Sequence, residues 1–163
     1  MTQNLQLQIL LMTHLVLIAF YLGGQFLTLA VTLPASYKFF NTNNQVKFLQ
    51  NIYKLQSPIL LFVLCLVVLS GGFMITPIKS QLGADYFAAF GSRLIIKLGF
   101  FFIVFLVSAY QALAVGFRLK ALDPAVCADN QASELGAVRT QLAVTSVINI
   151  IITIVVMYFG KRL

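Results

Sequence analysis

Four long windows without a charged side chain constrain this chain more than any other feature of its sequence. Residues 1–37, 55–78, 98–117 and 140–160 contain no Asp, Glu, Lys or Arg. Each window is long enough for the ~20 residues with which a helix crosses the hydrocarbon core of a bilayer. Lipid offers no partners to backbone polar groups, so only helices or closed barrels cross it, and long unbroken apolar runs favour helices. We therefore predict an all-α fold, an integral membrane four-helix transmembrane bundle.

The composition excludes an ordinary soluble domain. The 163 residues are 60% hydrophobic and only 9% charged, with a mean hydropathy of +0.94, far from the usage of soluble globular proteins. No separate domain, linker or low-complexity tract interrupts the pattern. We predict a single four-helix transmembrane domain over residues 1–163, with spans at about 9–33, 58–77, 97–118 and 142–160. Pro34 and Pro58 are expected to bound the first loop, and Arg93 to end the second.

The net charge of +7 comes from basic residues at the ends of the apolar segments. This placement indicates anchoring to lipid headgroups, so the predicted partner is the bilayer and not nucleic acid. The first loop is basic and has no acid, which favours placing it in the cytoplasm and the N-terminus outside. That orientation gives the cytoplasmic side six basic residues, Lys38, Lys47, Lys54, Arg118, Lys120 and Arg139, against five outside.

Polar side chains form stripes on two of the predicted helices. In the first helix the stripe contains His14, Tyr21, Gln25, Thr28 and Thr32, and in the fourth it contains Thr145, Asn149, Thr153 and Met157. Steps of three, four or seven residues place such groups on one helical face. We predict that the stripes face each other or a shared cavity, or alternatively that they only make interhelical hydrogen bonds of about 0.6 kcal/mol each.

Small residues indicate close helix packing. Ser108, Ala112 and Gly116 form a ridge at four-residue spacing, and the pairs Gly23–Gly24 and Gly71–Gly72 add further points of close approach. Small side chains at such positions let helix backbones approach each other in membranes.

The only histidine is the leading candidate for a functional residue. His14 lies about five residues, or roughly 8 Å, into the first helix, and ionisable groups inside a span are candidates for function. In an alternating bundle the methionines at a similar depth are Met12, Met74 and Met157. One imidazole with thioethers is a soft ligand set that suits Cu(I) and equally supplies axial ligands to haem iron. A structural histidine that is hydrogen-bonded in the core, and methionines that only fill space, are the alternatives.

Two cations lie near the level of His14. Arg93 and Lys97, four residues apart, present their charges on one helical face. They suit lipid phosphates, haem propionates or an acidic partner protein. All four carboxylates, Asp85, Asp123, Asp129 and Glu134, lie outside the predicted spans. Paired-carboxylate chemistry is therefore weakly supported. We predict no catalytic residue, and the sequence favours a protein that is not an enzyme.

Three segments carry a resemblance to a known family. The run His14-Leu-Val-Leu-Ile-Ala-Phe-Tyr-Leu-Gly-Gly24 resembles the first-helix signature of the copper resistance D (CopD-like) membrane family, a histidine followed by "W-L-G-G". Gly91-Ser-Arg93-Leu-Ile-Ile-Lys97-Leu98 is similar to its "Y-G-R-x-L-x-x-K-L" segment, and Leu69-Ser-Gly71-Gly72 to its "L-T-G" turn. The resemblance covers about residues 14–118. It implies a bacterial inner-membrane protein with its first loop in the cytoplasm, which moves or senses copper with His14 as the best candidate residue.

Three hypotheses about function follow from the sequence. The first is copper handling, with a Cu(I) site of His14 with Met74, Met157 or Met12, and with a periplasmic copper protein or a second copy of the chain as partner. The second is a b-type haem protein with His14 as axial ligand and Arg93 and Lys97 beside the propionates. The third is an accessory subunit of a larger membrane complex, in which the stripes and glycines serve only assembly.

Overall fold

The prediction of an all-α transmembrane bundle is confirmed. A computed structural model describes residues 2–39, 42–83, 86–123 and 129–161. Among these residues, four helical segments are long and apolar enough to cross a membrane: Leu5–Lys38, Asn44–Thr76, Leu94–Ala121 and Ala132–Tyr158. Many large apolar side chains on the outside of the bundle are exposed, among them Val16, Phe26 and Phe62. An apolar exterior of this kind is what a lipid environment requires, so the chain is a multi-pass membrane protein.

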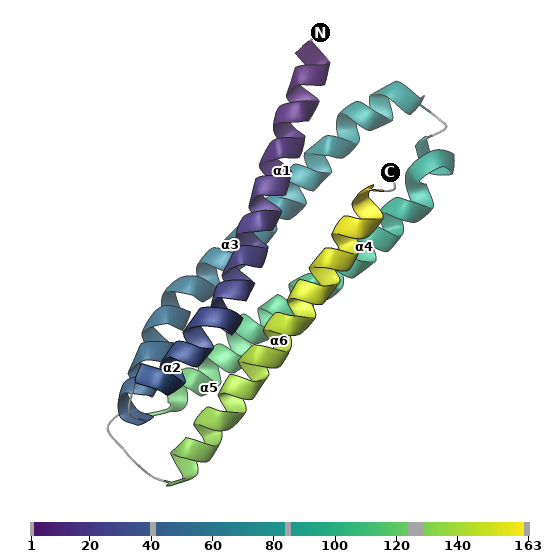
Figure 1. The fold of residues 1–163 in the computed structure, drawn as a ribbon. Coiled ribbons are helices and arrows are strands. Elements are labelled where there is room, and N and C mark those ends of the chain that lie inside the picture. The colour runs from purple at the N-terminus through teal and green to yellow at the C-terminus, as the bar shows by residue number, and fades with distance from the viewer. Residues whose placement is uncertain (1, 40–41, 84–85, 124–128, 162–163) are drawn as a thin grey trace.

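The helices alternate in direction (Figure 1). The first segment consists of α1 (Thr2–Leu27), the π-helical turn η1 (Thr28–Thr32) and α2 (Leu33–Phe39), and the second is the single helix α3 (Thr42–Leu82). The third consists of α4 (Tyr86–Tyr110), the π-helical turn η3 (Gln111–Val115) and α5 (Gly116–Ala121), and the fourth is α6 (Asp129–Lys161). The start of α1 and the ends of α3 and α6 therefore point to the same side of the bundle, which is called the upper end below.

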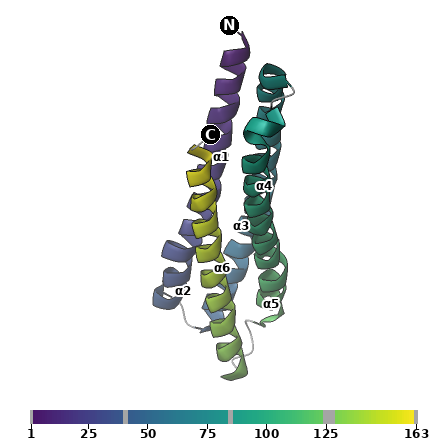
Figure 2. The ribbon, with the colours of Figure 1, turned by 90° about the vertical axis from the view of Figure 1, so that its right-hand side faces the viewer.

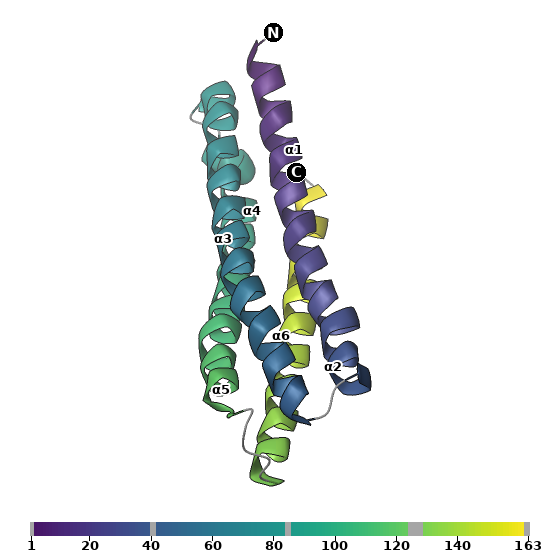
Figure 3. The same ribbon diagram turned by 90° about the vertical axis from the view of Figure 1, so that its left-hand side faces the viewer.

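Two helix pairs form the bundle. α1 packs mainly against α3, and α4 mainly against α6, while α1 also contacts α6. Figures 2 and 3 show α1 running beside both α3 and α6, and α6 displaced toward the lower end of the bundle. Each polar stripe of the sequence thus lies on a helix with a neighbour on either side.

The helices are longer than the predicted spans, and the predicted loops are wrong in extent. Pro34 lies inside α2, Pro58 lies in the middle of α3, and Arg93 lies inside α4. Proline removes one backbone donor from a helix, but membrane helices tolerate it because neighbouring groups satisfy the freed carbonyl. The π-helical turn η1 ends two residues before Pro34, and across it the N–H of Leu33 donates to the carbonyl of Thr28. Pro124 lies outside the described residues.

The interior is divided into three layers along the bundle axis. The lower layer is an apolar cluster that includes Leu33, Leu49, Val115, Leu119 and Leu142. The upper layer is a second apolar cluster of Tyr21, Leu60, Val63, Leu64 and Val104. On every one of the four segments, buried or half-buried polar residues lie between the two clusters. We call this middle layer the polar belt; its members are Gln25, Thr28, Tyr53, Gln56, Ser57, Ser108, Gln111, Thr145, Ser146 and Asn149.

The lower end carries cations held by neighbouring side chains. Arg118 donates from Nε and Nη2 to Glu134 Oε1, at 2.9 and 2.7 Å. The guanidinium of Arg139 lies 4.0 Å from the ring centroid of Tyr37 and donates to Gln45. Planar guanidinium groups commonly stack on aromatic rings in this way. These contacts fix basic side chains at one end of the bundle.

Candidate functional site

His14 is held between α1 and α3. Its ring is half-buried, and Nδ1 lies 2.8 Å from Ser70 Oγ. Ser70 in turn donates its hydroxyl proton to the carbonyl of Val67 at 3.0 Å. A serine hydroxyl has only one proton, so while Ser70 donates to Val67 it accepts from His14, and the neutral imidazole then carries its proton on Nδ1. The lone pair of the neutral ring is then on Nε2, the atom available to a ligand.

Gly71 allows this contact. A Cβ placed on Gly71 would lie 3.3 Å from His14 Cε1, whereas a Cβ on Gly72 would meet nothing within 4 Å. Of the predicted pair, Gly71 therefore leaves room for the His14 ring, and Gly72 lies on an open face. Gly23 and Gly24 differ similarly, because only Gly24 faces a neighbour, the Leu60 side chain.

The cations predicted near His14 are both in α4. Lys97 is half-buried. The side chain of Arg93 lies outside the described part of the structure. The structure thus joins an imidazole from α1 to a hydroxyl from α3, with the half-buried Lys97 of α4 at the same end of the bundle.

The methionines differ in their surroundings. Met74 is half-buried and lies four residues after Ser70 on α3, so it shares the helical face that meets His14. Met12 is 65% exposed and lies two residues before His14, away from the His14 face of α1. Met157 on α6 is 41% exposed. Of the three predicted thioethers, Met74 therefore has the placement that best suits a site shared with His14.

The α1 side of the polar belt is a connected set of hydrogen bonds. The Tyr21 hydroxyl, on the border of the upper apolar cluster, is hydrogen-bonded to Ser108 Oγ at 2.6 Å. Gln25 donates to the same Tyr21 hydroxyl at 3.4 Å. Gln56 donates to the Gly24 carbonyl at 2.8 Å and to Thr28 Oγ1 at 2.7 Å. The predicted stripe of α1 is thus bound to α3 and α4.

Gln111 is the centre of the belt on the other side. Its backbone carbonyl accepts from the Tyr53 hydroxyl of α3, and its side chain donates to Ser146 and accepts from Asn149, both of α6, at 3.3 Å. One residue of the third segment therefore joins α3 to α6. The middle parts of the predicted stripes of α1 and α6 lie at the same level, and residues of α3 and of the third segment link them; the cavity that the α1 stripe lines has no described α6 residue in its wall.

Both π-helical turns begin at the belt. Thr28 is the first residue of η1, and Gln111 is the first residue of η3. Across η3 the N–H of Gly116 donates to the Leu113 carbonyl, and the Gln111 carbonyl accepts from the Tyr53 hydroxyl. π-helical turns inside α-helices are rare and occur frequently at functional sites.

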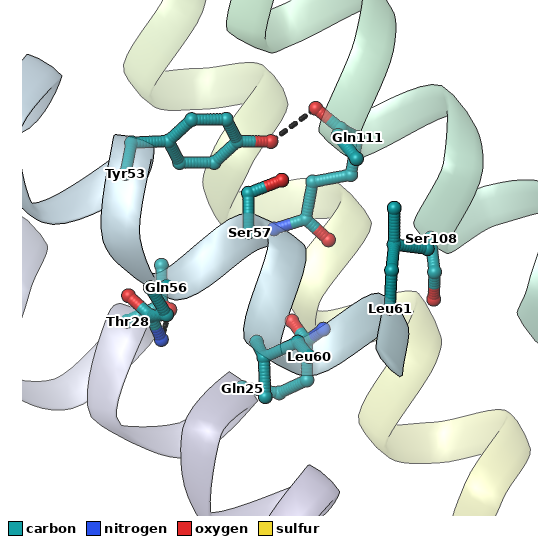
Figure 4. Close-up of a pocket in the computed structure, with 10 residues that line it drawn as sticks. Gln25, Thr28, Tyr53, Gln56, Ser57, Leu60, Leu61, Ser108 and Gln111 are labelled. Carbon is teal, nitrogen blue, oxygen red and sulfur yellow. Dashed lines mark hydrogen bonds between the residues drawn. The ribbon is translucent and has the colours of Figure 1, made fainter. Parts of the chain in front are cut away.

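A small cavity of about 20 Å³ lies within the belt. Figure 4 shows Gln25, Gln56, Ser57, Ser108 and Gln111 around it, with Leu60 and Leu61 on the apolar side. Ala112, from the predicted small-residue ridge, also lines it, while Gly116 lies against the ring of Tyr53. The small residues of the ridge thus leave room for the cavity and for the Tyr53 ring of α3.

Five residues of this layer are absent from the sequence-based prediction: Tyr53, Gln56, Ser57, Gln111 and Ser146. The first three belong to the stretch predicted as the first loop, since Pro58 marks the predicted start of the span. Gln111 lies three residues after Ser108, so helical spacing alone could have placed it on the same face. Its role as a link between helices depends on the packing.

The described residues contain no group of three or more His, Cys, Asp or Glu side chains that could hold a metal ion. Cys65 is a free, exposed cysteine of α3, and Cys127 lies outside the described residues. No protein-family model, curated protein or solved structure matches this chain.

Proposed function

We propose that the chain handles copper at a bacterial inner membrane, with Nε2 of His14 as a ligand of Cu(I). The observation that carries the proposal is the hydrogen bond between His14 Nδ1 and Ser70, which leaves Nε2 for a ligand. Metal-bound histidines usually donate their second ring N–H to such a partner, which fixes the ring and its tautomer. The resemblance of the segments around His14, Gly71 and Lys97 to the CopD-like family supports the same reading.

Met74 is the proposed second ligand. It shares the face of α3 that holds Ser70 against His14, and a thioether with an imidazole is a soft donor set that suits Cu(I). Both ligands are neutral, and the half-buried Lys97 adds a positive charge at the same end of the bundle, so the affinity for a cation is expected to be modest. A weak, exchangeable site suits a protein that passes copper on to a periplasmic partner. The proposal includes the orientation with the N-terminus outside, which places His14 near the periplasmic surface.

Anaerobic titration of the purified protein with Cu(I) against a chromophoric chelator tests this proposal. We expect one Cu(I) per chain in the wild type, no specific binding in His14→Ala, and weaker binding in Met74→Leu. Met12→Leu is the matched control, because Met12 is exposed and lies off the His14 face. Equal Cu(I) binding by the wild type and His14→Ala would overturn the proposal.

A b-type haem protein is the second candidate, and Lys97 is the observation that favours it. A half-buried ammonium at the same end of the bundle as the imidazole weakens a site for a cation but suits the propionates of a haem whose iron would be bound by His14. Haem, when bound, would supply one-electron chemistry. An optical spectrum of the purified protein decides whether haem is present.

Lys97→Gln separates the two candidates because it changes them in opposite directions. Removing the ammonium is expected to tighten Cu(I) binding, since like charges repel, and to loosen haem, since a propionate loses its partner. Lys79→Gln serves as control, because Lys79 is an exposed lysine of α3 near the same end of the bundle. Copper affinity and haem retention of the three proteins are measured side by side.

A further inference from the structure

The cavity in the polar belt contains an acceptor that nothing satisfies. Gln25 is 2% exposed and lines the cavity, and its Oε1 has no hydrogen-bond partner among the described residues. Its Nε2 makes one long bond, 3.4 Å to the hydroxyl of Tyr21. Gln25 lies near the middle of the span Leu5–Lys38, where bulk water does not reach the carbonyl. A buried amide oxygen without a donor is unusual and calls for one.

Three residues that line the cavity already donate elsewhere. Gln56 donates to the Gly24 carbonyl and to Thr28, and Gln111 donates to Ser146. The Tyr53 hydroxyl donates to the Gln111 carbonyl. None of these groups donates to Oε1 of Gln25, so a ligand that satisfies this oxygen brings a hydrogen-bond donor.

Size and charge select among small donors. A volume of about 20 Å³ accommodates one water-sized molecule. None of the residues that line the cavity carries a charge, and a cation at this depth without a counter-charge is costly. A neutral molecule with two donors meets both conditions.

We propose that the cavity holds one ordered water molecule that donates to Oε1 of Gln25 and links α1 to α3 and α4. The site lies at the level where both π-helical turns begin, since Thr28 and Gln111 are lining residues as well as the first residues of η1 and η3. The water completes the polar belt at the point where the direct hydrogen bonds are longest. This site is independent of His14 and of the proposed copper function.

The first test compares two variants that each remove a buried polar atom without a partner. Gln25→Met removes the acceptor at the cavity. Thr153→Val removes Oγ1 of Thr153, which is buried and unpartnered but does not line the cavity. With water present, Gln25→Met is expected to lower the Tm by about 2–4 °C, because the link through water is lost together with the long bond from Nε2 to Tyr21. Thr153→Val is expected to leave the Tm unchanged or to raise it. An unchanged or higher Tm for Gln25→Met overturns the proposal, because that is the result for a dry cavity.

The second test needs no variant that could misfold. In solid-state NMR of the wild type in liposomes, magnetisation transfer from water protons to the side-chain amide of Gln25 is expected, and its absence overturns the proposal. The Tm is also measured in sodium, potassium and choline chloride. Equal values support a neutral ligand, whereas a sodium-dependent rise that Gln25→Met abolishes shows a cation site and overturns the assignment of water.

Discussion

Ser70→Ala tests whether the hydrogen bond to Ser70 orients the His14 ring for binding Cu(I). The substitution removes the oxygen that accepts from Nδ1 at 2.8 Å and leaves the imidazole free to rotate or change tautomer. Loss of such a supporting partner typically lowers metal affinity by about 10–100-fold, which corresponds to about 1.4–2.7 kcal/mol. The carbonyl of Val67 lies beside the ring and is released by the loss of the Ser70 hydroxyl, so it can accept part of the lost bond. We therefore expect the lower end, about tenfold.

The assay is the anaerobic Cu(I) competition titration applied to four proteins. His14→Ala sets the background, and Ser57→Ala makes the same chemical change on the same helix at the polar belt. The expected order of affinity is wild type equal to Ser57→Ala, then Ser70→Ala, then His14→Ala. Should Ser70→Ala bind Cu(I) as tightly as the wild type while His14→Ala does not bind, the orienting role of Ser70 is refuted even though His14 remains a ligand.

Two further predictions concern packing in the membrane. Gly24→Ala places a Cβ against the Leu60 side chain, with Leu60 Cγ at 3.3 Å, and is expected to destabilise the bundle by about 1–3 kcal/mol. Gly23→Ala, whose Cβ meets nothing within 4 Å, is the control and is expected to be neutral or stabilising; equal losses for both would contradict the packing argument. Tyr53→Phe removes the donor to the Gln111 carbonyl and is expected to cost about 0.6 kcal/mol, and at most about 1.7 kcal/mol. Unfolding in mixed micelles measures all three, and a stabilised Tyr53→Phe would show that this hydrogen bond does not support the fold.

The number and direction of the helices could be predicted because lipid imposes a simple rule. A charge in the hydrocarbon core is costly, so four charge-free windows define four crossings whatever the packing. The same rule does not define where a helix ends, because a helix continues into the headgroup region without penalty. α3 begins at Thr42, well before the predicted start at Pro58, and carries the exposed Lys47 and Lys54 on its lower turns.

The candidate site could be predicted only in part. The position of His14 within a span made it a candidate, and the family resemblance pointed to the same residue. Its partner Ser70 could not be derived, because the pairing depends on how far α3 slides along α1. Tyr53, Gln56 and Ser57 belong to a predicted loop for a different reason, because Pro58 marks the predicted start of the second span, although they complete the belt. The π-helical turns have no sequence signal beyond the proximity of Pro34 to the first of them.

The layered interior suggests why these helices keep a single register. Apolar side chains on membrane helices gain little from one neighbour over another, since lipid is equally apolar. A shift of one helical turn, about 5.4 Å, would leave the two apolar clusters packed but would separate Tyr21 from Ser108 and Gln111 from Asn149. The unpaired groups would then face hydrocarbon. The same register places Ser70 opposite His14, so the polar belt fixes the geometry of the candidate site several turns away.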